Sequence, residues 1–459
     1  MQTIELKEAS RLVAEGSELT HGERMRLAEE RLHTLVDYAR EHSPYLAERY
    51  RNLPEDYTLS DLPVIEKGEV VNHFDSYVTD REVRLSDVEA FCNEVKQAGR
   101  LYLDKYTVLH TSGTTGKPLY MVRDDHRNKL HGQLMNQRLM RGLDPGILDI
   151  RKHKMAAVIF TERGASSYES ALRMLAAFPE YRDNFLIVNV MEDTATIVRK
   201  LNEFMPEVIS AYGSVLALLA MEQEKGNLHI SPAAVFNSAE MLTPENHVRV
   251  AKAFGCPVKN NYCMTEGGEI AMTWDGPELL LNEDFILIEP VDAERRPVAD
   301  PEAWSEGILV TDLTNFVQPV IRYFVNDKVK VERLSDDTVR LPVLRIQGRA
   351  NEIFQLCGEP FTTAGIDSIT ELYPGVVDFQ FTQVSDDELR VRAVTEIGMD
   401  REEILRGLAG ELENYFHTHG CPEAKVSAST EPPIKKERGG KAPRYIDLRA
   451  KETQGRLEE

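Results

Sequence analysis

The residues with the clearest chemical potential form a short loop of glycine and hydroxyl side chains. Residues 110–118 read HTSGTTGKP. Glycines let backbone N–H groups approach an anion closely, and serine and threonine hydroxyls can donate further hydrogen bonds. The loop therefore predicts a phosphate-binding site. Its members are Thr111, Ser112, Gly113, Thr114, Thr115, Gly116 and the cation Lys117.

The spacing of this loop differs from that of other nucleotide-binding motifs. Only two residues separate Gly113 from Gly116, and Pro118 follows the lysine. A P-loop needs four residues between its glycines and a serine or threonine after the lysine, and the dinucleotide motif GxGxxG is absent. The loop also joins two apparent strands, YTVLH and PLYMVR, instead of opening a helix. An ordinary Gly/Thr turn is the alternative, and the loop alone does not decide between the two.

Five later segments carry groups that could act on a nucleotide. Each has a simpler explanation by itself, because carboxylates are common at strand ends and a lysine in a glycine-rich tail is usually solvated. Their joint occurrence in one order favours a single functional site. The segments are NSAE at 237–240, NYCMTE at 261–266, PVIRYFVND at 319–327, QGRANE at 347–352 and GKAPR at 440–444.

Together with the loop, these segments resemble the motifs of the adenylate-forming superfamily of acyl-CoA synthetases, peptide-synthetase adenylation domains and luciferases. The chain is most similar to the phenylacetate–CoA ligase and CapK-like branch of that superfamily. The resemblance extends from the helical N-terminal region to Arg444, nearly the whole chain.

The resemblance implies which residues hold the nucleoside of ATP. Ser238, Ala239 and Glu240 match the small-residue-plus-glutamate segment that lies against the adenine. Tyr262 matches the tyrosine that stacks near the base, and Asp327 matches the aspartate that accepts hydrogen bonds from the ribose hydroxyls.

The resemblance also implies which residues act on the phosphates. Thr265 contacts the α-phosphate and Glu266 holds Mg²⁺, a cation that favours one carboxylate together with phosphate oxygens. Arg349 contacts ATP from the interdomain motif. Lys441 is the adenylation lysine, and Lys117 stabilises the departing pyrophosphate.

These groups fit one chemistry, in which an oxyanion attacks the α-phosphorus of ATP and positioning and charge neutralisation carry the catalysis. The implied function is a ligase that adenylates a carboxylic acid, aromatic or small, and transfers the acyl group to CoA. Its cofactors would be ATP, Mg²⁺ and CoA. The alternative is an adenylating enzyme that forms a C–N or N–N bond with an amine, as an amide synthetase or a nitrite-activating diazotase; a carrier protein is another acceptor. A catalytically dead nucleotide-binding module is a third hypothesis, against which the intact motif residues argue.

Two departures from the family pattern bear on the substrate and on metals. Cys263 stands where the family usually has glycine, which predicts a shallower acceptor pocket. Segment 274–284, WDGPELLLNED, lacks the histidine and cysteine that many members carry, so we do not expect a structural zinc.

The pattern of elements predicts an α/β protein. Short apolar strands alternate with amphipathic helices from 156 to 262, which is typical of a parallel sheet flanked by helices. Strands dominate from 285 to 346 and predict a barrel-like β subdomain. A mixed unit with strands at 376–384, 388–396 and 424–430 and a helix at 400–417 follows. We therefore predict an N-terminal adenylation core, 1–348, and a small mobile α+β lid domain, 349–459, that carries Lys441.

Composition narrows the class of partner. The formal net charge of −22 argues against nucleic acid, which requires a basic face. The sequence has no apolar run of about 20 residues and no signal-peptide core, so we expect a cytoplasmic protein without membrane spans. The five cysteines are odd in number and form no CxxC, which argues against disulfides. A homodimer is suggested only by the resemblance.

Overall fold

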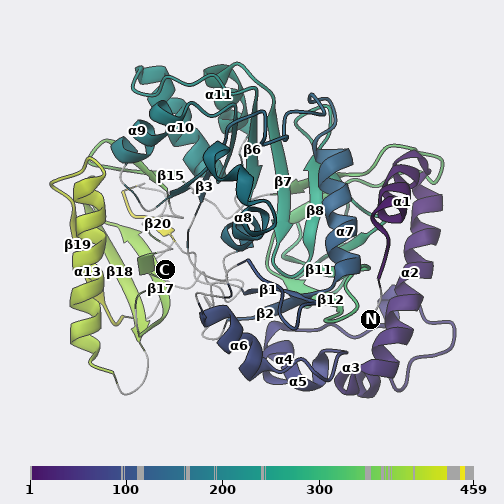
Figure 1. Ribbon diagram of the computed structural model, residues 1–459. Coiled ribbons are helices and arrows are strands. Elements are labelled where there is room, and N and C mark those ends of the chain that lie inside the picture. Colours follow the sequence, from purple (N-terminus) through teal and green to yellow (C-terminus); the bar gives the residue numbers. More distant parts are fainter. Residues whose placement is uncertain are drawn as a thin grey trace. The chain divides into compact units, whose positions relative to one another are not determined.

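The chain divides into two compact units in its computed structural model, shown in Figure 1. The larger unit is Met1–Thr111, Leu119–Val188 and Leu201–Gly348, and the smaller unit is Ser112–Pro118, Asn189–Lys200 and Arg349–Glu459. The structure describes residues 3–94, 97, 99–110, 118–159, 161, 166–190, 192, 194–238, 242, 244–346, 353–362, 366, 369, 370, 373, 375–395, 399–431 and 445–449.

A nine-stranded sheet forms the centre of the larger unit, in the order β13-β14-β9-β8-β7-β6-β5-β3-β4. Four of its strands are parallel: β3 (Met155–Ile159), β5 (Val208–Ala211), β6 (Ala234–Ser238) and β7 (Val258–Met264). The others are β4 (Phe185–Asn189), β8 (Gly268–Thr273), β9 (Leu279–Leu281), β13 (Val329–Val331) and β14 (Val343–Ile346). The predicted parallel sheet is thus confirmed.

Helices alternate with the parallel strands, as the apolar periodicity predicts. They are α8 (Ser166–Ala177), α9 (Thr194–Phe204), α10 (Gly213–Lys225) and α11 (Pro244–Phe254). α10 and α11 pack against each other and contact β6 and β7, respectively (Figure 1). A strand that returns to the same sheet through a helix runs parallel to its predecessor, which explains the strand directions.

A smaller antiparallel sheet follows in the chain. Its strands are β10 (Ile286–Val291), β11 (Gly307–Asp312) and β12 (Val320–Val325). The last two strands expected in this subdomain instead extend the large sheet as β13 and β14. Strand pairing places them there, because β13 pairs with β14, and β14 pairs with β9 with Val343 opposite Leu280 and Leu344 opposite Leu279.

The N-terminal helices are anchored to this core by buried ion pairs. They include α1 (Leu6–Glu18), α2 (His21–His42), α3 (Pro44–Arg49), α4 (Lys67–Asn72), α5 (Phe74–Tyr77) and α6 (Leu85–Asn93). Arg24 of α2 pairs with Glu283 at 2.7 Å. Arg138 pairs with Asp284 at 2.7 Å and donates a hydrogen bond to Ser17 Oγ of α1 at 3.2 Å. The two carboxylates at the end of segment 274–284 therefore connect α1 and α2 to the core. In the described parts of the chain, no group of three or more His, Cys, Asp or Glu residues could hold a metal ion.

The smaller unit contains a four-stranded sheet, β19-β18-β17-β20, and one long helix. Its elements are β15 (Ile353–Leu356), β16 (Glu359–Thr362), β17 (Val376–Gln383), β18 (Glu388–Thr395), α13 (Arg401–Thr418), β19 (Lys425–Ser429) and β20 (Tyr445–Asp447). The predicted elements between 376 and 430 are confirmed. The helix buries Ile404, Leu408, Leu412 and Phe416, which are four residues apart and share one face.

One expectation about the cysteines is wrong. Cys357 and Cys421 form a disulfide, with Cα atoms 5.5 Å apart. Cys357 lies in the turn between β15 and β16, and Cys421 follows α13. Folding brings together two residues separated by 64 positions, a relation that spacing in the sequence does not reveal.

No helix within the described ranges is both long and apolar enough to cross a membrane.

Candidate active site

Two antiparallel strands hold the ends of the glycine loop. β1 (Thr107–His110) pairs with β2 (Tyr120–Arg123), and His110 lies opposite Tyr120. The prediction that the loop joins two strands is confirmed. The loop residues Thr111 to Lys117 lie outside the described residues, so their phosphate-binding role stays a prediction.

The segment predicted to lie against the adenine, 237–240, and the segment NYCMTE, 261–266, come from neighbouring strands of the large sheet. β6 and β7 are parallel, and Ser238 lies opposite Asn261. Their carboxyl ends therefore lie side by side, which is where α/β sheets commonly bind ligands. Ala239, Glu240, Arg349 and Lys441 lie outside the described residues, as does the side chain of Ser238.

Two residues assigned to the nucleoside contact each other directly. The phenol of Tyr262 donates a hydrogen bond to Asp327 Oδ2 at 2.6 Å. They are 65 positions apart, on β7 and after the end of β12. The structure thus joins the motif segment to the segment that ends in the predicted ribose aspartate.

Glu266 lies in the turn between β7 and β8. Burial raises its pKa, while the charges of Lys67 and Arg123 and a hydrogen bond from Tyr323 act in the opposite direction. The Tyr323 hydroxyl donates to Glu266 Oε1 over 3.4 Å. A buried carboxylate of this kind suits a hard divalent cation. The sequence contains Tyr323 in the segment PVIRYFVND, but no spacing rule links it to Glu266.

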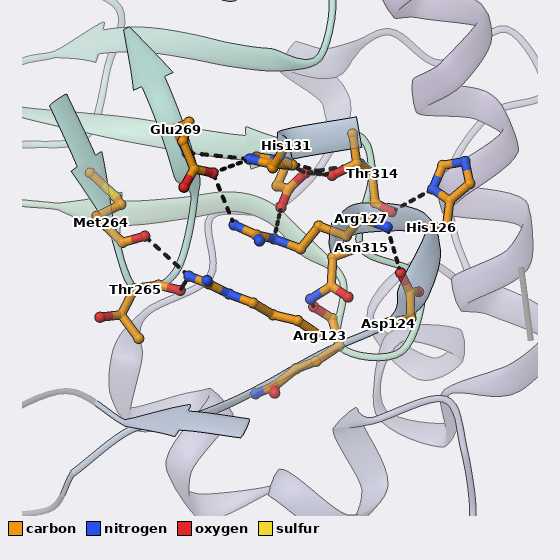
Figure 2. A network of polar contacts seen from close by, with 12 residues as sticks. Arg123, Asp124, His126, Arg127, His131, Met264, Thr265, Glu269, Thr314 and Asn315 are labelled. Atoms are coloured by element: carbon orange, nitrogen blue, oxygen red, sulfur yellow. Dashed lines mark hydrogen bonds and ion pairs between the residues drawn. The ribbon is translucent and has the colours of Figure 1, made fainter. Parts of the chain in front are cut away.

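A network of buried charges adjoins this turn and was not predicted (Figure 2). It arises on β2 and on α7 (Asp125–Leu134). Asp124 caps α7, because its side chain accepts hydrogen bonds from the backbone N–H groups of Arg127 and Phe316. The cap fixes the start of the helix, and Arg127 and His131, four residues apart, share its buried face.

The network pairs these two basic side chains with acids from two strands. Arg127 Nε lies 3.3 Å from Asp312 Oδ2, and its Nη2 lies 3.9 Å from Glu269 Oε2. His131 contacts Glu269 through Nδ1 and the Thr314 hydroxyl through Nε2, the latter at 3.0 Å. Burial raises the pKa of Asp312, but His131 and Arg127 outweigh it and lower the value to about 2. Both acids therefore stay ionised and bind the strands to α7.

Arg123 connects this network to the turn. Its Nη2 donates to the backbone oxygen of Thr265 at 2.7 Å and lies 3.5 Å from that of Met264. Figure 2 shows the Arg123 and Arg127 side chains extending toward the segment of Met264, Thr265 and Glu269. Burial and the charge of Arg127 lower the pKa of Arg123 to about 9, so it is still charged at neutral pH.

Substitution of Gly268 by alanine should destabilise the fold strongly. Gly268 has φ +70°, and a Cβ there would lie 1.9 Å from Arg127 Nη2 and 2.6 Å from His131 Cε1. We expect a loss of about 3 kcal/mol or more in the free energy of unfolding, measured by chemical denaturation. The matched control is Gly226→Ala, where φ is +77° and no atom lies within 4 Å. That variant should lose about 1 kcal/mol, the backbone term alone. If both variants lost the same free energy of unfolding, the side chains of Arg127 and His131 would move to accept the new methyl group at no energetic cost.

Comparison with solved structures shows that the chain shares the fold of an acyl-CoA ligase. One structure of 2-hydroxyisobutyryl-CoA ligase, in complex with 2-HIB-AMP and CoA in the thioesterification state, aligns with a TM-score of 0.57 and 20% identity, covering 95% of this chain and 93% of that one. A structure of the same ligase in the postadenylation state with 2-HIB-AMP aligns with a TM-score of 0.52 and 19% identity, covering 94% and 91%.

One curated relative matches about half of the chain. Protein CapK of Staphylococcus aureus is 27% identical over 235 residues, which are 50% of this chain and 51% of CapK. The chain thus spans about half the length of the curated relative it matches. No family model matches the chain.

Proposed function

We propose that the protein is an ATP-dependent, AMP-forming ligase. It adenylates a carboxylic acid, aromatic or small, releases pyrophosphate and transfers the acyl group to CoA. The observation that carries this proposal is the hydrogen bond from Tyr262 to Asp327 beside the turn that holds Thr265 and Glu266. It brings four motif residues to one edge of a fold shared with a ligase whose structure holds an acyl-AMP and CoA.

The described residues fit the needs of the first half-reaction. The other carboxylate oxygen of Asp327 would accept from a ribose hydroxyl, and the Tyr262 hydroxyl is bonded to the same carboxylate. The Thr265 hydroxyl would orient the α-phosphate, and Glu266 would hold Mg²⁺, which supplies charge neutralisation at the phosphates. The bonds that form and break belong to the acid and to ATP. The protein therefore contributes by positioning these substrates and by neutralising their charge.

The remaining assignments are part of the same proposal. The glycine loop with Lys117 would bind the leaving pyrophosphate, and residues 238–240 would lie against the adenine. The core would be 1–348. The lid domain, 349–459, would bring Lys441 to the attacking oxyanion and Arg349 to the nucleotide, and a mobile lid would let the lysine leave before acyl transfer.

The test is pyrophosphate release from MgATP with aryl acids, short aliphatic acids, amino acids and nitrite, each with and without CoA. Release with an organic acid, and a thioester when CoA is present, supports the ligase. Release that is indifferent to CoA and requires an amine, or that occurs only with nitrite, supports the C–N or N–N bond-forming alternative. No release with any acid, from protein shown to be folded, contradicts adenylation.

Asp327→Ala should remove selectivity for ribose. A lost hydrogen bond to a charged group costs about 1.5–3 kcal/mol, so the KM for ATP should rise about 10- to 100-fold. The wild-type protein should also prefer ATP to 2′-deoxy-ATP and 3′-deoxy-ATP, and the variant should lose that preference. Asp300→Ala, at an exposed aspartate, is the matched control and should behave as the wild type. A preference that survives in Asp327→Ala would assign ribose recognition elsewhere.

A further inference from the structure

The turn that carries Thr265 and Glu266 lies against a layer of buried basic side chains. The layer consists of Arg123 at the end of β2 and Arg127 and His131 on α7, which are 7%, 2% and 3% exposed. Burying three such polar side chains beside one short turn is costly unless each has a defined partner. The partners therefore indicate what each residue does.

Two of the three have acids as partners. Arg127 pairs with Asp312 and Glu269, and His131 pairs with Glu269 and lies 3.7 Å from Asp312. These contacts bind α7 to β8 and β11, and they account for the two residues as structural supports.

Arg123 differs from the other two. Its recorded hydrogen bonds, within the part of the chain that the structure describes, go to the backbone oxygens of Thr265 and Met264. No carboxylate of a described residue lies within ion-pair distance of it, and its buried Nε has no hydrogen-bond partner there. The bond to Thr265, at 2.7 Å, is the strong one, and the contact with Met264, at 3.5 Å, is weak. A guanidinium bonded to the Thr265 carbonyl restricts the orientation of the peptide that follows it, because the carbonyl direction sets the plane of its peptide.

The strands that this turn connects hold only its ends, where Met264 of β7 pairs with Gly268 of β8. Glycines at 267 and 268 follow Glu266, and they leave the backbone more freedom than other residues would. Gly268 also packs so closely on Arg127 and His131 that no side chain fits there. Between the paired ends, the hydrogen bond from Arg123 holds the backbone oxygen of Thr265.

We propose that Arg123 is a positioning residue, which holds the backbone of Thr265 and Glu266 in the geometry that binds MgATP. It acts through the two carbonyl groups and need not touch the substrate. This inference rests on the proposed function, since it assumes that the turn holds the magnesium–phosphate group.

The experiment measures ATP binding by calorimetry with Mg²⁺ and with EDTA. In Arg123→Gln, the Kd for MgATP should rise about tenfold or more, while the Kd for ATP in EDTA should stay within about threefold of the wild-type value. Arg123→Lys keeps the charge and can donate to one carbonyl, so its Kd for MgATP should be intermediate. Kd values for MgATP equal to wild type in both variants would overturn the proposal, as would equal weakening with and without Mg²⁺.

A control separates positioning from loss of stability. Arg138→Gln breaks the buried pair with Asp284, outside the network around the turn, and should lower the Tm at least as much as Arg123→Gln. Its response to Mg²⁺ should match that of the wild type. Binding and turnover test different proposals. Wild-type protein that binds MgATP but releases no pyrophosphate would contradict the proposed function. The role of Arg123 would still be decided by the Kd values of its variants.

Discussion

Glu266→Gln should lower the rate of pyrophosphate release by about two orders of magnitude. The amide keeps the shape of the side chain but removes the negative charge that a hard cation requires, and several kcal/mol of phosphate neutralisation depend on that cation. The measurement is kcat for pyrophosphate release at saturating ATP and acid, repeated over a range of Mg²⁺ concentrations. We expect that added Mg²⁺ does not restore the rate.

Tyr323→Phe is the matched control for this substitution. It removes the hydroxyl that lies 3.4 Å from Glu266 and leaves the carboxylate in place. A contact of that length is weak, so kcat should stay within about threefold of the wild-type value. If Glu266→Gln turned over like the wild type at limiting Mg²⁺, Glu266 would not be a metal ligand.

Lys441→Ala should abolish most adenylation while leaving ATP binding nearly intact. A lysine that places its ammonium between an attacking oxyanion and the α-phosphate acts mainly in the transition state, and removal of one such group costs about 10²- to 10³-fold in kcat. The Kd for MgATP should change by less than about fivefold, since the loop and the turn hold the phosphates. Stopped-flow measurement of adenylate formation in a single turnover tests this directly.

The second half-reaction gives the sharper comparison. Lys441→Ala supplied with the synthetic acyl-adenylate and CoA should form thioester at close to the wild-type rate, because the lysine is needed only in the first step. Lys451→Ala, ten positions further along the chain, should be unaffected in both steps. Normal adenylation in the Lys441 variant would require another group to carry the catalytic charge.

Regular elements with a strong apolar period could be predicted closely from the sequence. The helix expected at 400–417 begins at Arg401 and ends at Thr418, and the strand expected at 388–396 is Glu388–Thr395. Such elements can be read from their own residues. A helix shows apolar side chains three or four positions apart, and a strand shows them at alternate positions. The glycine loop was placed between two strands for the same reason.

Long-range relations could not be predicted in this way. Strands 329–331 and 343–346 read as part of the smaller sheet, but β14 pairs with the distant strand β9 of the large sheet. The pairing of Cys357 with Cys421 and the contact of Tyr323 with Glu266 depend on the completed fold. The residues in these contacts are of common types and have no characteristic spacing, so the local sequence does not predict the contacts.

The same distinction between local patterns and long-range contacts applies to the candidate site. Thr265 and Glu266 were proposed as site residues because they stand in a contiguous, recognisable motif, and their roles stay a prediction. Arg123 was missed because its function lies in a contact with a backbone carbonyl 142 positions away. A backbone acceptor exists at every residue, so no pattern of side chains distinguishes this one.

The first helix of the chain, α1, is connected through packing contacts to the turn that carries Thr265. α1 packs along α7. Lys129 Nζ of α7 donates to the oxygen of Ile4, just before α1, at 2.9 Å, and Gln137 Nε2, just after α7, donates to Ser10 of α1 at 3.0 Å. α7 in turn carries Arg127 and His131, which contact Glu269 of β8 next to the turn at Thr265. A chain of contacts therefore links the opening helix to a turn about 250 residues further along the chain.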